Sequence, residues 1–161
     1  MLSLEELKEE VRYLEDRLQD AKSPIVFCHN DAMPANMVLK DDGFVALIDL
    51  EYGGPNHAAY DIANLFNEYI GCDEVLNYKS NYPNEYVIKD WLFSYLTEFE
   101  GKEPSNAEVA QLHKEVCLFS VCGHLIWSTW AVIQAVSSQI EFDYLNYARQ
   151  RINQYWLVKN S

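Results

Sequence analysis

Three polar side chains at a fixed spacing, Asp31, Asn36 and Asp49, are the residues best suited to chemistry in this sequence. Asp31 follows a short apolar run, Asn36 comes five residues later, and Asp49 ends a second apolar run. In phosphoryl transfer a carboxylate accepts the hydroxyl proton, while an amide oxygen and a second carboxylate hold magnesium on the nucleotide. The pattern therefore predicts phosphoryl transfer from ATP, with Asp31 as base and Asn36 and Asp49 on Mg²⁺. Glu51 is a further candidate metal ligand.

The segments around these side chains are predicted to be a short strand, a catalytic loop and a hairpin. The strand is the apolar run 24–28, and the hairpin pairs residues 37–39 with 44–48 across the turn sequence Asp41-Asp42-Gly43. Protein kinases have the same Asp-to-Asn spacing, followed by a hairpin that delivers a metal-binding Asp. No Phe-Gly follows Asp49 and the chain has no Ala-Pro-Glu, so it departs from the protein kinases themselves.

A longer series of polar positions resembles the choline/ethanolamine kinase family. Its signature is H-N-D-x4-N, then I-D-x-E-Y, then N-x4-D-I-x-N-x-F-x-E, and the chain carries it as His29-Asn30-Asp31, Asn36, Ile48-Asp49-Leu50-Glu51-Tyr52, Asn56, Asp61, Asn64 and Glu68. The match is specific because several polar positions agree over about forty residues. The resemblance implies ATP-dependent, Mg²⁺-dependent phosphorylation of the hydroxyl of ethanolamine or choline. That reaction is the first step of phosphatidylethanolamine and phosphatidylcholine synthesis.

Aromatic residues toward the C-terminus form a second candidate site. Trp127 and Trp130 lie three apart on one helical face, and more rings follow between residues 142 and 147. Aromatic residues at helical spacing are usually core residues, but rings together with a carboxylate also bind an ammonium group. The resemblance implies that the substrate amine is bound by Tyr52, Glu68, Trp127, Trp130, Phe142, Tyr144 and Tyr147.

Two residues near the predicted catalytic loop are expected to have structural roles. His29 is read as a buried, hydrogen-bonded residue in preference to a general base. A helix predicted from Asn56, as its N-cap, to about Ile70 puts Asp61, Asn64 and Glu68 on one face. Such a face is ordinarily solvated. Its position directly after the loop instead favours Asp61 as a brace that accepts hydrogen bonds from the loop's backbone.

Elsewhere the pattern of apolar residues predicts a mostly helical chain. Helices are expected over 4–20, with a capping box at Ser3 and Glu6, over 88–99, over 105–138 with an interruption near Gly123, and from Asp143 to about Trp156, with a loop over 71–85. The predicted fold class is α+β: a protein-kinase-like C-terminal lobe, mostly helical, with a small β-hairpin around the catalytic loop.

The parts of a kinase that cover the nucleotide are missing from the sequence. There is no Gly-x-Gly-x-x-Gly loop, and no strand lysine precedes Ile25. Residues 1–161 are therefore expected to form one catalytic and amine-binding lobe without its N-terminal nucleotide lobe. Alone, this lobe is expected to be incomplete as an enzyme and to bind ATP poorly.

Composition and charge narrow the class of protein further. A net charge of −13 argues against binding to nucleic acid. The four cysteines show no metal or disulfide spacing, so buried thiols in a reducing compartment, the cytoplasm, are expected. Residues 116–136 carry no Asp, Glu, Lys or Arg and could span a bilayer, but their several polar residues favour a core helix. The sequence leaves a homo-oligomer open.

Two other functions remain open at this point. An aminoglycoside-type phosphotransferase would share Asp31, Asn36 and Asp49 but not the aromatic amine site. A non-catalytic lobe could bind an amine and transfer nothing. Between the two amines, ethanolamine is favoured because choline kinases often place an extra Tyr shortly after the residue that matches Glu68, where this chain has Cys72-Asp73.

Overall fold

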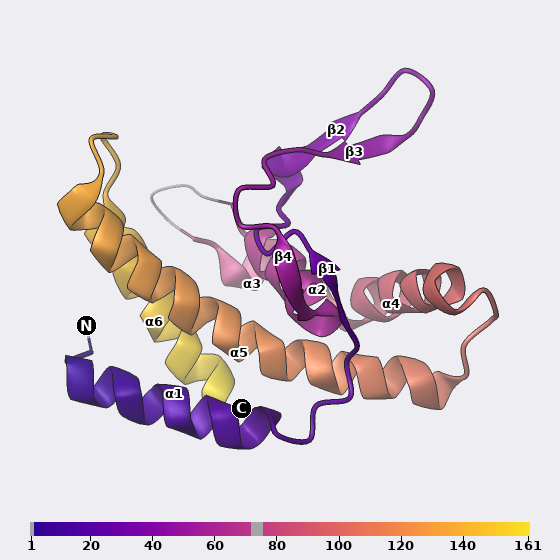
Figure 1. Cartoon of the computed structure of the whole chain (residues 1–161), viewed down its shortest axis with the longest axis horizontal. Coiled ribbons are helices and arrows are strands. Elements are labelled where there is room, and N and C mark those ends of the chain that lie inside the picture. Colours follow the sequence, from indigo (N-terminus) through magenta and orange to yellow (C-terminus); the bar gives the residue numbers. More distant parts are fainter. Residues whose placement is uncertain (1, 72–75) are drawn as a thin grey trace. The chain divides into compact units, whose positions relative to one another are not determined.

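The computed structural model describes residues 2–71 and 76–161, and these residues form two compact units, each described here by itself. The first unit comprises residues 2–22, 76 and 121–161, and the second comprises residues 23–71 and 77–120. Helix α5 (Asn106–Ser137) contributes to both (Figure 1). The helix runs through Gly123 without the interruption predicted from the sequence, since its backbone hydrogen bonding continues past that glycine.

A two-stranded antiparallel sheet and a buried helix form the centre of the second unit. Strand β1 (Ile25–Cys28) pairs with β4 (Gly54–His57), and α2 (Ala58–Glu68) follows β4 directly. Ten of the eleven residues of α2 are buried. The predicted N-cap at Asn56 is wrong: Asn56 lies in β4 opposite Val26, and the cap residue is His57. The side chain of Asn56 is instead bonded to Asn30 and to the backbone of His57.

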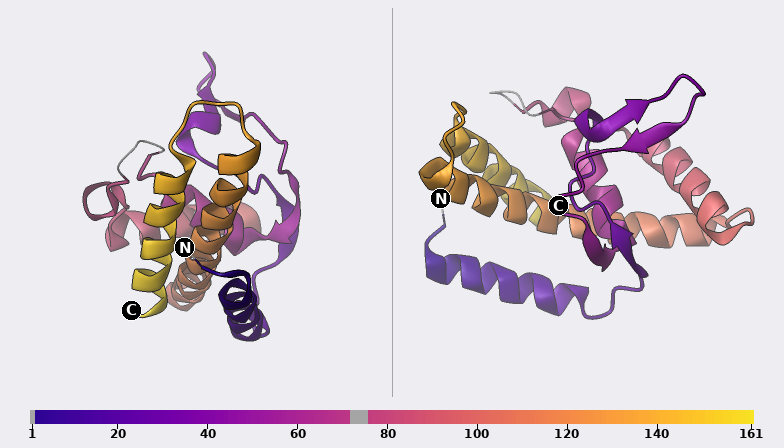
Figure 2. Two further views of the ribbon diagram at one scale, coloured as in Figure 1. Left: turned by 90° about the vertical axis from the view of Figure 1, so that its left-hand side faces the viewer. Right: turned by 45° about the horizontal axis from the view of Figure 1, so that its top comes forward.

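The predicted hairpin is present as β2 (Met37–Leu39) and β3 (Val45–Leu47), preceded by the short 3₁₀ helix η1 (Pro34–Asn36). Gly43, with a φ of 83°, provides the left-handed residue in its turn. Figures 1 and 2 show the hairpin projecting from the rest of its unit. Its apolar side chains are accordingly exposed: Val38, Leu39, Phe44, Val45 and Leu47.

Two further helices complete the second unit with the first half of α5. Within the stretch predicted to be a loop, residues 78–81 form a short helix, α3 (Tyr78–Asn81), which is capped by the side chain of Asn77. Helix α4 (Glu85–Glu100) begins at its N-cap Asn84 and ends at Gly101, which has a φ of 66°. Ser120 on α5 donates its hydroxyl to Asn67 on α2 at 2.7 Å and accepts the amide of Asn67 on its own carbonyl at 3.1 Å.

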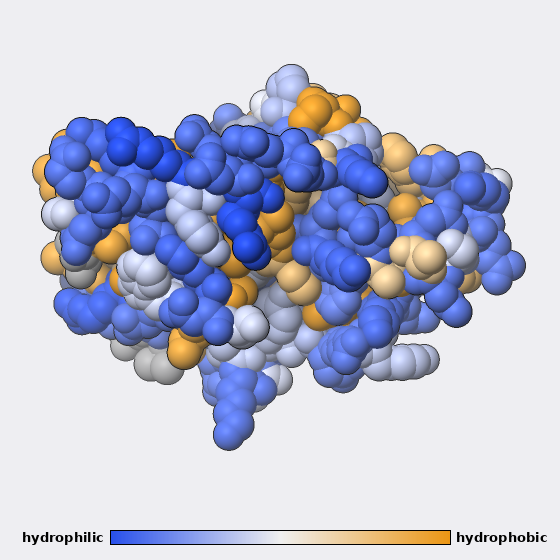
Figure 3. Space-filling model, turned by 90° about the horizontal axis from the view of Figure 1, so that it is seen from below, coloured by the Kyte–Doolittle hydropathy of each residue, from blue (hydrophilic) through white to orange (hydrophobic). Residues whose placement is uncertain are grey.

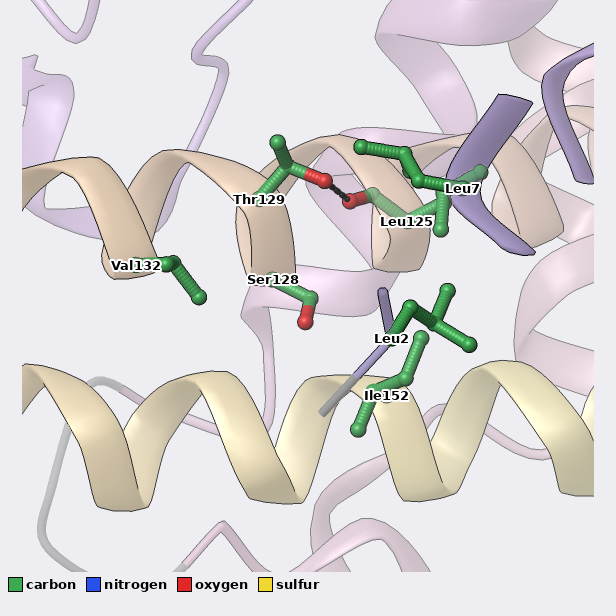
Figure 4. A pocket seen from close by; sticks show the side chains of 7 residues that line it. All are labelled: Leu2, Leu7, Leu125, Ser128, Thr129, Val132 and Ile152. Atoms are coloured by element: carbon green, nitrogen blue, oxygen red, sulfur yellow. Dashed lines mark hydrogen bonds between the residues drawn. The ribbon is translucent and has the colours of Figure 1, made fainter. Parts of the chain in front are cut away.

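The first unit consists of α1 (Leu4–Leu18), α6 (Tyr144–Lys159) and the second half of α5. The capping box of Ser3 and Glu6 and the Asp143 cap are both present, as predicted. Glu10 on α1 accepts hydrogen bonds from Tyr155 and Lys159 on α6, which ties these helices together. Figure 4 shows an apolar cavity of about 90 Å³ in this unit, lined by Leu2, Leu7, Leu125, Ser128, Thr129, Val132 and Ile152.

Burial settles several expectations about single residues. By length and composition α5 could cross a membrane, but 61 % of its most apolar window is buried by the fold, as in a core helix.

Cys28 and Cys122 are buried as predicted, whereas Cys117 is exposed and Cys72 lies outside the described residues. The face in Figure 3 is mostly hydrophilic with scattered apolar patches.

Candidate active site

Asp31 and Asn36 are in direct contact at the centre of the candidate site. The side-chain nitrogen of Asn36 donates to the backbone carbonyl of Asp31 at 3.0 Å and to its carboxylate at 3.3 Å. The backbone carbonyl of Asn36 in turn accepts the N–H of Ile48, the residue that follows β3, at 3.0 Å. With its amide nitrogen committed in this way, Asn36 presents its amide oxygen as the atom that could ligate a metal ion.

One face of α2 holds the catalytic loop on both sides of Asp31. The Asp61 carboxylate accepts the N–H of His29 at 2.7 Å and that of Asn30 at 2.8 Å, the contact expected of a brace. One turn further along, Asn64 donates to the carbonyl of Ala32 at 3.1 Å. The helix face is therefore buried against the loop and not solvated. Sequence reasoning assigned no role to Asn64, although its spacing of three residues from Asp61 was the signal.

His29 connects the catalytic loop to the end of the hairpin. It is 2 % exposed, and its Nε2 lies 2.8 Å from the carbonyl of Ile48. A buried ring fixed in this way fits the structural role predicted for it. Because Ile48 precedes Asp49, the contact also fixes the segment that carries this candidate metal ligand.

The charges around Asp31 shift its acidity. Burial, the negative charge of Glu68 and, less strongly, that of Asp49 raise the pKa of Asp31 to about 6, against the opposing effects of His29 and Asn36. Glu68 is itself only 5 % exposed, on α2. The carboxylates of Glu68 and Asp49 therefore act on Asp31 through their negative charges. A carboxylate whose pKa is raised by burial and by nearby charge is a common feature of catalytic sites.

The raised pKa makes a prediction about stability. The folded chain binds a proton at Asp31 more tightly than the unfolded chain, whose Asp has a pKa near 3.8. Ionised Asp31 therefore destabilises the fold above about pH 6, and the penalty declines as the pH falls from 6 toward 3.8. We expect Asp31→Asn to raise the free energy of unfolding by about 1–2 kcal/mol at pH 7.5, after allowance for solvent screening, and by about half as much near pH 5. Urea unfolding followed by Trp fluorescence measures the free energy of unfolding at each pH. An equal increase at pH 7.5 and pH 5 would contradict the raised pKa of Asp31.

The segment after β3 carries the remaining candidate metal ligands. Asp49 is exposed and has a φ of 62°, a left-handed conformation that few non-glycine residues adopt. Glu51 is also exposed. In this segment Gly53 approaches Phe27 so closely that an added Cβ would lie 3.0 Å from its ring. Within residues 2–71 and 76–161 no three His, Cys, Asp or Glu side chains form a metal cluster, so a metal ion here would need Asn36 and substrate oxygens beside Asp49.

The aromatic residues of the candidate amine site form a continuous cluster in the first unit. The rings of Trp127 and Trp130 lie 5.4 Å apart, edge to face, and Trp130 lies 5.8 Å from Tyr144. Phe142 contacts both Tyr144 at 4.9 Å and Tyr147 at 5.9 Å. Edge-to-face packing of this kind stabilises the cluster itself. The guanidinium of Arg151 lies over the ring of Tyr147, 5.6 Å from its centre, so one ring of the cluster already faces a cation.

The remaining two residues predicted for the amine site lie in the second unit. Tyr52 is exposed in the segment after Asp49, and Glu68 is buried at the end of α2. A common amine site for these two residues and the five rings of the first unit stays a prediction.

Comparison with known proteins identifies the class to which this fold and loop belong. The chain resembles the Plasmodium vivax ethanolamine kinase structure, with a TM-score of 0.84 and 27 % identity over 99 % of this chain and 41 % of that one. It also resembles choline kinase from Cryptosporidium parvum, with a TM-score of 0.83 and 28 % identity over 97 % of this chain and 49 % of that one. The predicted fold class, an α+β, protein-kinase-like fold that is mostly helical with a small β-hairpin, is confirmed, and the structure adds a second antiparallel pair, β1 with β4.

The sequence comparisons give the family. Ethanolamine kinase 2 of Rattus norvegicus is 42 % identical over 157 residues, which cover 97 % of this chain and 40 % of that protein. The sequence profile described as Choline/ethanolamine kinase matches residues 1–156. The chain belongs to the choline/ethanolamine kinase family, and it spans about 40 % of the length of the curated relatives it matches.

Proposed function

We propose that the protein catalyses, or forms the catalytic part of an enzyme that catalyses, ATP-dependent phosphorylation of the hydroxyl of ethanolamine, with choline as the other candidate acceptor. The observation that carries the proposal is the contact of Asn36 with the carboxylate of Asp31, whose pKa is raised by burial and by the neighbouring Glu68 and Asp49. Membership of a family whose relatives include proteins named ethanolamine kinase supports it.

Each residue of the loop has a separate task in this reaction. Asp31 orients the substrate hydroxyl and accepts its proton. The oxygens of Asn36 and Asp49 would hold Mg²⁺, and Glu51 would help to hold a second ion. When bound, Mg²⁺ neutralises charge on the ATP phosphates. The chain's own contribution is mainly positioning: Asp61 and Asn64 fix the loop, and His29 fixes the end of the hairpin beside it.

The amine is proposed to bind between aromatic rings and a carboxylate. Each ring contributes about 1–2 kcal/mol to a cation from which water is excluded. The ring cluster around Trp127 and Trp130 supports such a site, with Tyr52 supplying a further ring and Glu68 the negative charge. Ethanolamine is favoured because a primary ammonium donates hydrogen bonds and depends less on a complete cage of rings than a trimethylammonium does.

Exposed apolar surface on the second unit supports the proposal that further polypeptide completes the enzyme. Phe27, Leu39 and Phe44 are each about 70 % exposed. An apolar groove of about 230 Å³, lined in part by Phe27, lies between β1, the hairpin residues Met37 and Leu47, α2 and α4. An isolated two-stranded hairpin is marginally stable in water, so a covering segment would stabilise this one. We infer that the chain is the C-terminal catalytic lobe, that a nucleotide-binding lobe contacts this surface, and that the enzyme works in the cytoplasm.

A substrate panel tests the function. The complete gene product that contains this chain is incubated with Mg²⁺·ATP and, separately, with ethanolamine, choline and kanamycin, and products are identified by ³¹P NMR. We expect phosphoethanolamine, with phosphocholine formed more slowly. Phosphorylation of kanamycin alone would favour the aminoglycoside-type alternative. Calorimetric binding of an amine without binding of Mg²⁺·ATP or turnover would favour a non-catalytic amine-binding protein.

A further inference from the structure

Asn30, the middle residue of the His-Asn-Asp motif, has no role in the mechanism above, yet its side-chain amide and its backbone N–H are all hydrogen-bonded. Its side-chain nitrogen donates to the carbonyl of Tyr52 at 2.8 Å, and its side-chain oxygen accepts from Asn56 at 2.9 Å. Its backbone N–H donates to Asp61 at 2.8 Å. Its φ of 65° lies in the left-handed region, which Asn tolerates better than most residues.

Asn56 fixes the direction of these hydrogen bonds. Its side-chain oxygen accepts the N–H of His57 at 2.8 Å, so its amide nitrogen must face Asn30. Asn30 must then present its oxygen to Asn56 and its nitrogen to Tyr52. Turning either amide over would bring donor against donor or acceptor against acceptor. Asn56 lies in β4 and is paired with Val26 of β1. The series of hydrogen bonds from Asn56 through Asn30 to Tyr52 therefore starts on the sheet of the second unit.

His29 and Asn30, the two residues before Asp31, therefore contact the backbone on either side of Asp49. His29 contacts the carbonyl of Ile48, immediately before Asp49, and Asn30 bonds the carbonyl of Tyr52, three residues after it. Asp49 itself has a left-handed φ of 62°, a conformation that costs a non-glycine residue free energy, though less for Asn and Asp than for others, and that a restraint from the surroundings stabilises. The two contacts provide that restraint from the segment that carries Asp31.

We propose that Asn30, oriented by Asn56, is a positioning residue that fixes the metal-binding segment 49–52 relative to Asp31. The proposal rests on the proposed function for its kinetic consequence, but its structural consequence is independent of it. A misplacement of about 1 Å between reacting groups costs about a hundredfold in rate. The proposed function assigns Asn30 no contact with either substrate, so its effect on the reaction is transmitted through the segment that it holds.

Asn30→Gly is the sharpest test, because glycine keeps the left-handed backbone and removes both side-chain bonds. We expect kcat for ethanolamine to fall by about 10–100-fold and the Mg²⁺ concentration for half-maximal rate to rise several-fold. KM for the amine should rise less, by the amount that Tyr52, whose carbonyl Asn30 holds, contributes to the proposed amine site. In the 161-residue chain, hydrogen exchange should accelerate at the amides of residues 49–53 and not in α4. Asn56→Ala removes the bond that orients Asn30 and the bond from the His57 N–H, but it leaves the bond from Asn30 to Tyr52 in place, so it should give smaller changes of the same kind.

Asn84→Ala is the matched control, since it removes a helix cap on α4 and should lower stability without changing the Mg²⁺ dependence. Unchanged exchange at residues 49–53 in both Asn30→Gly and Asn56→Ala would overturn the proposal, as would unchanged Mg²⁺ dependence in an active enzyme. If the wild-type enzyme phosphorylates no amine, the proposed function fails, and hydrogen exchange alone decides the positioning role. If Asn30→Gly does not fold, Asn56→Ala decides it in the same way.

Discussion

Asp31→Asn in the complete gene product is expected to lower kcat for ethanolamine by about 10²–10⁴-fold, the range for loss of a general base. Asparagine keeps the size of the side chain but cannot take the hydroxyl proton. The KM for the amine should change little, because the proposed amine contacts come from the aromatic rings and Glu68. Initial rates over a range of ethanolamine concentrations, at saturating Mg²⁺·ATP, separate the two quantities.

The exposed hairpin supplies a control for this substitution. Asp41→Asn removes a negative charge from the same unit, at an exposed position in the turn, and should leave kcat within about twofold of wild type. Asp31→Asn should also be folded and more stable at neutral pH, so lost activity cannot be attributed to lost structure. A near-normal kcat for Asp31→Asn would remove Asp31 from the mechanism.

The local parts of the site could be predicted from the sequence because their signals are local. The spacing of Asp31 and Asn36 is short enough for direct contact, and the structure has that contact. The hairpin turn at Asp41-Asp42-Gly43 specified the strands on either side of it. The brace by Asp61 was also predictable, because the polar spacing on α2 begins directly after the loop that the helix holds.

The rest depended on pairings that residue types alone do not indicate. Strand β4 has the sequence Gly-Pro-Asn-His, a poor strand by propensity, and it forms because β1 pairs with it across an intervening hairpin. Asn56 therefore looked like a helix cap, although its amide serves Asn30. The burial of Glu68 could not be predicted either, because a polar stripe on a helix is usually solvated.

Asp49→Asn is expected to lower activity by about 10²–10³-fold, the scale for loss of one preorganised electrostatic contact, and to raise the Mg²⁺ concentration for half-maximal rate more than tenfold. The neutral amide binds Mg²⁺ less tightly than the carboxylate it replaces. Removing the charge of Asp49 should also lower the pKa of Asp31 from about 6, because that charge is one of its causes. A ¹³C titration of the Asp31 carboxyl in the chain measures this shift without any metal or substrate.

The two readouts for Asp49→Asn separate a metal ligand from a residue that merely lies near Asp31. Glu51→Gln is the matched control, because Glu51 is two residues away, equally exposed and absent from the causes of the Asp31 shift. It should leave the pKa of Asp31 unchanged and affect the Mg²⁺ dependence less. If Asp49→Asn lowers the pKa of Asp31 but leaves the Mg²⁺ dependence as in wild type, then Asp49 acts only through its charge, and the ion is held elsewhere.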